Sequence, residues 1–132
     1  MEHFVAYHSG PYMKDELKPT NDNFGFYSRK RKSQLLRIIG NNVWMISGTR
    51  DRDKRMIYRL HGFYIASRVS QAQDSRFLHL VSGTEVHVLK LPVTLNDFVW
   101  FWDLYKEQNN FSLGMNKIRD GKVVAQLEKL MS

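Results

Sequence analysis

The sequence predicts a single α+β domain, in which a small β-barrel or a strongly bent mixed sheet is flanked by helices, two of them C-terminal. Segments with the alternation of half-buried strands fill most of the first 91 residues, and turn-forming residues separate them. After Pro92 the apolar residues instead recur at helical spacing to the end of the chain. With 132 residues and a hydrophobic content of 42%, the chain is long enough to bury one core. We therefore expect residues 1–91 to form the sheet core and residues 92–132 to form a helical part packed on it.

The expected strands are apolar or aromatic runs bounded by turn formers. They are His3–His8, Val43–Gly48, Arg55–Val69, Arg76–Val81 and Thr84–Leu91, with Phe24–Ser28 as a short strand or turn. A charged tip at residues 50–54 joins the second and third runs into a hairpin, and Ser82-Gly83 joins the last two. The polar stretch that follows Ser9, Gly10 and Pro11, up to residue 23, is expected to be a loop.

Helix start and stop signals predict three helices. A short one, Gln34–Ile39, lies between Ser33 as its N-cap and Gly40 as its C-terminal stop. Thr94 and Asp97 resemble the capping box of a second helix. Its apolar face would comprise Leu95, Phe98, Trp102 and Tyr105. The third begins at Asp120, with an apolar face of Val123, Val124, Leu127, Leu130 and Met131.

Trp100 and Trp102 lie two residues apart in the second of these helices. Side chains at this spacing point about 200° apart, so the two rings cannot form one cage. We assign both to the core or to an interface.

Positive charge is concentrated in one stretch of chain, from Arg29 to Arg59. It contains ten Lys/Arg and two Asp, a net charge of +8, whereas the remaining ten bases and eleven acids nearly cancel. Trp44 lies inside this stretch and Tyr27 just before it. A basic surface beside aromatic rings is what binding of phosphates and stacking of bases require. The same charge also suits the solvated surface of a basic protein.

Composition and motifs exclude several functional classes. The chain has no cysteine, which rules out disulfides and thiolate zinc sites, and its five histidines show no metal-ligand spacing. No phosphate-binding glycine loop and no nucleophile elbow occurs. The N-terminus lacks the basic start and apolar run of a signal peptide, and no stretch approaches the length of a membrane span. We expect a cytoplasmic, non-catalytic protein with no cofactor, no metal and no membrane partner.

Four segments of the first half carry a family resemblance: HFVAYHS, GFYSRKRKSQLL, IIGNNVWMISGT and YRLHGFYIASRV. Their order resembles that of the EVE, YTH and related domains of the PUA-like superfamily. In those domains an opening aromatic strand ends near a serine, and a short aromatic-plus-Ser/Thr segment leads into a helix. The resemblance implies a compact β-barrel that reads a single, often chemically modified, nucleobase flipped into an aromatic pocket.

The resemblance places the pocket on two short segments and its rim on the bases that follow. The residues are Tyr7, His8 and Ser9, then Phe26, Tyr27 and Ser28, with Arg29, Lys30, Arg31 and Lys32 at the rim to hold phosphates. Trp44 is either a further pocket wall or a core residue, and the same alternatives hold for Tyr7. Arg50 and Arg52, in the hairpin tip, belong either to an arm along a nucleic-acid backbone or to a loop whose alternating charges pair with one another.

We therefore predict a nucleic-acid-binding module that recognises one base of DNA or RNA in an aromatic pocket with a basic rim. A first alternative is a protein-interaction or regulatory module that docks a partner through the aromatic C-terminal helix. That alternative would need an exposed stripe of Phe98, Trp102 and Tyr105. A second alternative is a small nuclease-like enzyme, which would need acids and a histidine converging on the basic cleft.

Overall fold

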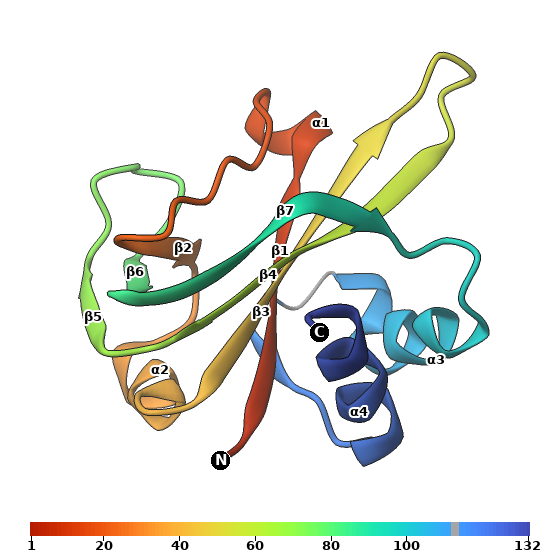
Figure 1. Cartoon of the computed structure of the whole chain (residues 1–132). Coiled ribbons are helices and arrows are strands. Elements are labelled where there is room, and N and C mark those ends of the chain that lie inside the picture. Colours follow the sequence, from red (N-terminus) through yellow and green to blue (C-terminus); the bar gives the residue numbers. More distant parts are fainter. Residues whose placement is uncertain (112–113) are drawn as a thin grey trace.

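The computed structural model describes residues 1–111 and 114–132, and it shows an α+β fold with two sheets and flanking helices (Figure 1). The strands are β1 (His3–Ser9), β2 (Phe24–Ser28), β3 (Asn42–Arg50), β4 (Met56–Ile65), β5 (Arg68–Gln71), β6 (His79–Gly83), β7 (Glu85–Thr94) and β8 (Asn116–Lys117). The helices are α1 (Gly10–Met13), α2 (Lys32–Leu35), α3 (Val99–Glu107) and α4 (Gly121–Leu130), with short 3-10 turns at Leu36–Ile38 and Asn109–Phe111. No helix in the described part of the chain is long and apolar enough to cross a membrane.

The larger sheet is mixed and the smaller one is antiparallel. The larger has the order β7-β4-β3-β1-β8, in which β1 and β3 are parallel, and the smaller has the order β2-β6-β5. Over residues 1–111 and 114–132 the strands do not close into a barrel. The expected α+β class is therefore confirmed and a strongly bent sheet is compatible with these two sheets, whereas the expected closed barrel is wrong.

One long bent hairpin explains why there are two sheets. The ladder that pairs Ile65 with Glu85 in the larger sheet continues in the same register to pair Arg68 with Ser82 in the smaller. At the bend the chains approach closely, since a Cβ added to Gly83 would lie 2.0 Å from the Ile65 carbonyl oxygen. The prediction of a turn at Ser82-Gly83 is therefore wrong. A glycine there permits a sharp bend without reversing the chain.

The two faces of the larger sheet carry two separate cores. The inter-sheet core lies toward the smaller sheet and α2, and consists of Phe4, Ala6, Leu17, Phe26, Leu35, Ile38, Val43, Met45, Tyr64, Ala66, Val81, Val86 and Met115. The helix-side core lies toward α3 and α4, and consists of Val5, Trp44, Ile46, Tyr58, Leu60, Leu95, Phe101, Leu104, Phe111, Ile118, Val123 and Leu127. Alternation along β1 and β3 sends successive side chains to opposite cores, as expected for strands buried on both faces.

The C-terminal part differs from its prediction at its first helix. β7 continues past Pro92 to Thr94, so α3 begins at Val99 and Phe98 occupies its N-cap position. The helix consequently buries Phe101 and Leu104, whereas Trp102 remains 37% exposed. The predicted start and buried face were wrong because edge strand β7 accommodates a proline. This part is also not wholly helical, since β8 joins the larger sheet beside β1.

The last helix and the short helix were predicted more closely. Asp120 caps α4 as expected, because its carboxylate accepts a hydrogen bond of 2.9 Å from the Lys122 amide. Gly40 ends the short helical segment with φ of 85°, also as expected. Ser33 is not the N-cap, however. Arg31 takes that position, and its amide donates to the Gln34 Oε1 atom.

Candidate functional site

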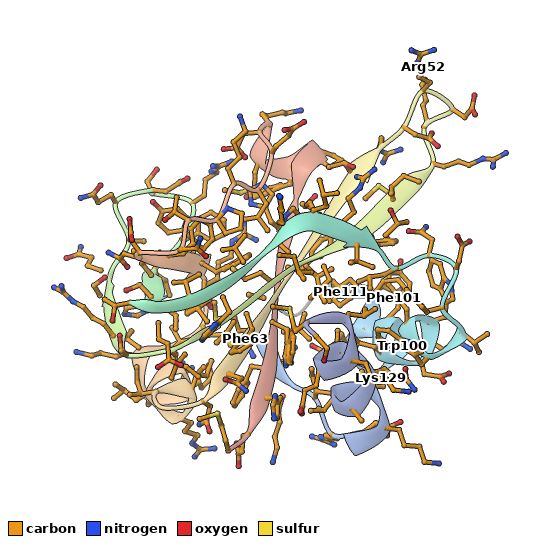
Figure 2. All side chains as sticks on the ribbon, in the orientation of Figure 1. Arg52, Phe63, Trp100, Phe101, Phe111 and Lys129 are labelled. Atoms are coloured by element: carbon orange, nitrogen blue, oxygen red, sulfur yellow. The ribbon has the colours of Figure 1, made fainter. Side chains whose placement is uncertain are left out.

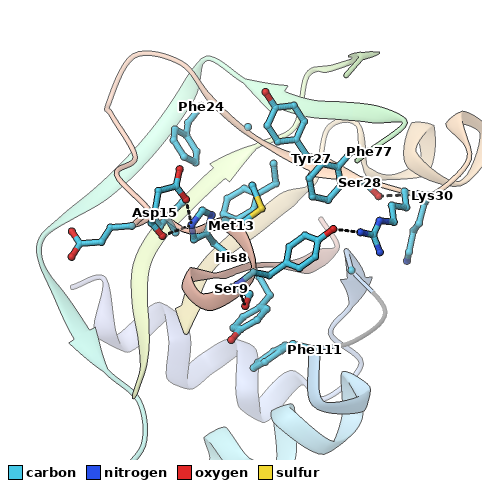
Figure 3. Close-up of a pocket in the computed structure, with 18 of the residues that line it drawn as sticks. His8, Ser9, Met13, Asp15, Phe24, Tyr27, Ser28, Lys30, Phe77 and Phe111 are labelled. Atoms are coloured by element: carbon cyan, nitrogen blue, oxygen red, sulfur yellow. Dashed lines mark hydrogen bonds and ion pairs between the residues drawn. The ribbon is translucent and has the colours of Figure 1, made fainter. Parts of the chain in front are cut away.

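A cavity of about 1230 Å³ opens between α1, the loop that follows it and the end of β2 (Figure 3). Among the residues that line it are nine of the predicted site residues: Tyr7, His8, Ser9, Phe26, Tyr27, Ser28, Arg29, Lys30 and Arg31. Two segments about 20 residues apart in the sequence thus meet in one hollow. They meet because β1 and β2 belong to different sheets, which face each other across the inter-sheet core.

Three aromatic rings stand together at the cavity mouth, and we call Tyr12, Tyr27 and Phe77 the rim cluster. Tyr27 and Phe77 are stacked, with ring centroids 5.3 Å apart and planes at 15°. Tyr12 meets Phe77 edge-on, at 6.4 Å and 82°. Tyr27 is 37% exposed, which leaves part of its ring accessible to a ligand.

Two guanidinium groups lie over the rim cluster. The Cζ atom of Arg29 is 5.4 Å from the Tyr12 ring centroid, and that of Arg76 is 5.3 Å from the same centroid. Arg29 also donates to the Tyr12 hydroxyl and, through Nε at 3.1 Å, to the Arg76 carbonyl oxygen. Cations over ring faces hold both partners in place, so the rim cluster is a fixed platform with positive charge.

Arg76 is itself oriented by Asp74. Its Nη2 and Nε atoms lie 2.7 Å and 3.1 Å from the two carboxylate oxygens in a fork-like arrangement. Hydrogen bonding to Arg76 lowers the pKa of Asp74 to about 2. This pair therefore keeps the Arg76 side chain against the rim cluster.

Phenylalanines line the inner part of the cavity. Phe24 and Phe26 meet edge to face, with centroids 5.7 Å apart, and Phe26 stacks on the buried Tyr64 at 6.3 Å. A Cβ added to Gly25 between them would lie 2.6 Å from the Val81 carbonyl oxygen, so β2 can lie this close to β6 only with glycine there. The cavity thus has an apolar floor below a polar mouth.

His8 ties one wall of the cavity to β1. Its Nε2 atom lies 3.1 Å from the Asp15 carboxylate and 3.2 Å from the Asp15 carbonyl oxygen. Both are acceptors, so Nε2 carries a hydrogen and donates. Only 12% of the His8 side chain is exposed. The loop after α1, which also contributes Glu16 and Lys18 to the lining, is held in place by this contact.

Behind His8 lies a buried polar pair. Ser47, the register partner of His8 on β3, shares a hydrogen bond of 2.7 Å with His61 Nε2. Burial, with smaller contributions from Arg59 and His8, lowers the pKa of His61 to about 4. His61 is therefore neutral near pH 7 and serves the folded structure.

Lys30 is engaged within the protein. Its Nζ atom donates at 2.5 Å to the Met115 carbonyl oxygen and at 2.5 Å to the Asn116 side chain, which links the end of β2 to β8. Burial lowers its pKa. The amide of Lys30 donates to Ser28 Oγ at 3.1 Å, so Ser28 is buried and holds the backbone at the end of β2. Both acceptors are uncharged, so the ammonium keeps its positive charge at the cavity lining, and the role of Lys30 as a rim phosphate contact stays a prediction.

Tyr7 belongs to both the cavity lining and the helix side of the sheet. It stacks on Phe111 at 4.8 Å and 10°, and burial raises the pKa of its hydroxyl to about 12. A Cβ added to Gly48 would lie 1.9 Å from the Tyr7 hydroxyl. The ring can therefore occupy this place only because β3 has a glycine opposite it.

Four predicted site residues lie outside the cavity lining. Trp44 is 1% exposed, donates to His3 Nδ1 at 3.1 Å and belongs to the helix-side core, so its assignment as a pocket wall is wrong. Lys32 is the first residue of α2 and exposed. Arg50 and Arg52 lie at and beyond the end of β3, in a projecting hairpin (Figure 2). The basic stretch is therefore continuous in sequence but divided in space.

Sequence reasoning missed several lining residues, chiefly Tyr12, Phe24, Phe77 and Phe111. Tyr12 was placed in a loop, but Ser9 caps a one-turn helix there by accepting a hydrogen bond from the Tyr12 amide. Phe77 is an aromatic residue beside an arginine in a polar segment. Tyr27 likewise lies close to an arginine, Arg29. An aromatic residue near an arginine could therefore have indicated Phe77 from the sequence.

The described residues contain no group of three or more His, Cys, Asp or Glu side chains that could hold a metal ion. Comparison of the chain with protein-family models, curated proteins and solved structures found no match.

Proposed function

We propose that this protein binds nucleic acid and holds one base in the cavity, with the flanking phosphates at its basic mouth. The observation that supports this best is the rim cluster, in which partly exposed aromatic rings and two guanidiniums stand at the opening of an aromatic cavity. Stacking of a base on an aromatic ring contributes about 1–3 kcal/mol, and arginine adds cation–π attraction. Cavities for small ligands usually measure about 300–1000 Å³. At about 1230 Å³, this one has room for a nucleotide-sized group.

The charges of the cavity lining suit an anionic ligand at the mouth. Its Lys and Arg residues are Lys18, Arg29, Lys30 and Arg31, and its acidic residues are Asp15 and Glu16. Asp15 is engaged by His8, and Arg31 makes no ion pair with any residue in the described ranges. Positive charge at the rim would bind phosphates and release counterions, so binding should weaken steeply as salt rises.

We extend the proposal to the fold family. The resemblance to the PUA-like superfamily rests on an opening strand that ends near a serine and on an aromatic-plus-serine segment before a helix. Here β1 ends at Ser9, and Phe26, Tyr27 and Ser28 end β2 shortly before α2. Both segments line the same cavity, which supports a shared base-reading role.

Fluorescence anisotropy with short single- and double-stranded DNA and RNA, with and without modified cytosine or adenine, tests the proposal. The expected result is salt-sensitive binding that falls at least roughly tenfold in Tyr27→Ala, the loss of about one stacking contact. Trp100→Ala, on α3 at the other side of the larger sheet, is the matched control and should bind normally (Figure 2). Absence of binding to every probe at low salt, or equal losses in the two variants, would overturn it.

The protein-interaction alternative gains little support. It would need an exposed stripe of Phe98, Trp102 and Tyr105, but Tyr105 packs 5.5 Å from Tyr58 and Trp102 donates to the Asn96 carbonyl oxygen at 2.9 Å. Phe98 and Tyr105 pack against the helix-side core, so of the three rings only Trp102, at 37%, is among the exposed large hydrophobic residues in the described part of the chain.

A nuclease-like enzyme is a second candidate, because a histidine and two acidic residues lie in the basic cavity. His8, Asp15 and Glu16 line the same basic hollow as Arg29 and Arg31. Incubation of labelled DNA and RNA with Mg²⁺ or Mn²⁺ tests it. Metal-dependent cleavage that disappears in Glu16→Gln would favour this candidate, whereas intact probes under conditions of demonstrated binding would exclude it.

A further inference from the structure

The hairpin between β3 and β4 continues beyond the rest of the larger sheet. Pairing of β1 with β3 ends at Gly48, and pairing of β7 with β4 ends at Arg59. From Thr49 to Ile57 the two strands pair in the sheet only with each other, and we call this two-stranded ribbon the arm. Met56 still contacts the body, since its carbonyl oxygen accepts a hydrogen bond from Asn96 and its side chain packs against the helix-side core. Residues 50–55 form the projecting end of the arm (Figures 1 and 2). At about 3.3 Å per residue, its tip lies roughly 13 Å beyond Gly48.

The turn of the arm is internally ordered. The Asp51 amide donates to the Arg55 carbonyl oxygen at 2.9 Å, and Lys54 adopts a left-handed conformation. Oδ1 of Asp51 accepts hydrogen bonds from the amides of Asp53 and Arg55, at 2.8 and 2.9 Å. This carboxylate is therefore engaged by the turn, as in an Asx turn.

The basic side chains of the arm, in contrast, are free. Arg50, Arg52, Lys54 and Arg55 are exposed, and none makes an ion pair with any residue that the structure describes. The idea that the alternating charges of the tip pair with one another is therefore wrong. Residues 50–55 comprise four basic and two acidic side chains, a net charge of +2, which an anionic partner would complement.

The base of the arm adjoins the wall of the cavity. A Cβ added to Gly10, the first residue of α1, would lie 3.1 Å from the Gly48 carbonyl oxygen and 3.2 Å from Thr49 Cγ2. α1 also contributes Tyr12 and Met13 to the cavity lining. A nucleic acid with one nucleotide in the cavity would thus pass beside the arm within roughly four base pairs, at about 3.4 Å each.

We infer that the arm binds double-stranded DNA in the groove that flanks the nucleotide held in the cavity. The major groove of B-DNA, about 12 Å wide, accepts a two-stranded β-ribbon. The major groove of A-form RNA is too deep and narrow for side chains to read, and a short single strand would not reach the tip. This inference rests on the proposed function and narrows its ligand to duplex DNA with one extruded base.

The test compares Arg50→Gln/Arg52→Gln/Arg55→Gln with the matched variant Lys106→Gln/Lys122→Gln/Lys129→Gln, which removes three exposed charges from α3 and α4. The probes are a DNA duplex of about two helical turns with a central mismatch, which eases base extrusion, and a single strand of about four nucleotides. The arm variant should bind the duplex at least roughly tenfold more weakly, with a salt slope lower by about 2–3. It should bind the short strand normally, and the matched variant should bind both probes normally.

Four results would overturn the inference. Equal losses on duplex and short strand, or unchanged duplex binding by the arm variant, would show that the arm has no separate duplex contact. Equally strong, arm-dependent binding of an RNA duplex would contradict the choice of DNA. Failure of the unmodified protein to bind either probe would overturn the proposed function as well, and this outcome is distinct from the others.

Discussion

The two faces of the larger sheet are both rich in aromatic residues, yet they are covered to different extents. On the helix side, α3 and α4 cover the rings, so that Trp44 and Phe101 are fully enclosed. On the other face, the smaller sheet covers only part of the surface, and near Phe24 and Tyr27 the rings line an open cavity. An aromatic residue on this sheet is thus enclosed in a core or left accessible according to what the neighbouring elements cover.

Phe101→Ala should have the largest effect and should affect stability alone. Removal of a fully buried phenylalanine leaves a cavity and costs about 3–5 kcal/mol of the free energy of unfolding. Urea denaturation followed by circular dichroism measures it. Val99→Ala on the same helix is the control, since Val99 is 83% exposed and its loss should change little. A loss below about 1 kcal/mol for Phe101→Ala would show that the helix side is not the sealed core described above.

Acidification should lower the free energy of unfolding through His61, which lies behind His8 of the cavity lining. Its pKa is about 4 in the folded state and 6.5 in the unfolded chain, so only the unfolded state takes up a proton between these values. Stability is complete above pH 6.5, falls by roughly 3 kcal/mol as the pH drops to about 4, and then levels off. Urea unfolding from pH 7.5 to 4 should show this fall relative to His61→Gln. A His87→Gln control, at an exposed histidine, should retain it. Identical pH profiles for the protein and His61→Gln would contradict the prediction.

Phe77→Ala should weaken nucleic-acid binding and leave stability nearly intact. Phe77 stacks on Tyr27 and lies beneath both rim guanidiniums, so its loss should disorder the platform and reduce affinity by about 1–2 kcal/mol, roughly tenfold. The neighbouring Leu78 is 56% exposed, and Leu78→Ala provides the control. Anisotropy titration measures the affinity. Equal affinities for the two variants would remove Phe77 from the site.

Substitutions of Lys30 and Arg31 should have the smallest effects. They should distinguish a charge that stabilises the fold from a charge that binds the ligand. Lys30→Gln should reduce the free energy of unfolding by about 1–2 kcal/mol, because two partly buried acceptors at Met115 and Asn116 lose their donor. Arg31→Gln should leave stability unchanged and lower the salt slope of binding by about 1. Thermal unfolding and salt titrations, done on both variants, check this. The reverse pattern would mean that Lys30 is the phosphate contact.

The sequence was most informative where local patterns determine structure. Apolar runs predicted β1 and β3, and Asp120 marked the start of α4, because these signals depend on neighbouring residues. Alternation predicted β4, but the expected strand from Arg55 to Val69 is divided into β4 and β5. The bend at Gly83 could not be predicted, because a glycine between two apolar runs signals a turn and a sharp bend equally well. Whether two sheets close into a barrel depends on pairing between strands that lie far apart in the sequence.

The candidate site was predicted in part for a similar reason. Tyr7–Ser9 and Phe26–Arg31 reached the same cavity because each flanks a strand end. Of the two alternatives left open for Trp44, pocket wall or core, the structure shows the core, and a one-residue difference in strand register decides between such faces. Phe77 and Phe111 come from distant segments that only the folded chain brings near the first strand. The hydrogen bond between Lys30 and Asn116 of β8 likewise cannot be predicted from neighbouring residues in the sequence.

The most direct test of which face binds is a titration of the labelled protein with a short DNA oligonucleotide, followed by amide NMR. We predict that the largest shift changes occur at Tyr27, Ser28 and Phe77 around the cavity mouth, with α3 and α4 unaffected. Changes confined to α3 and α4, or no changes at all at saturating oligonucleotide, would contradict the assignment of the cavity as the nucleic-acid-binding site.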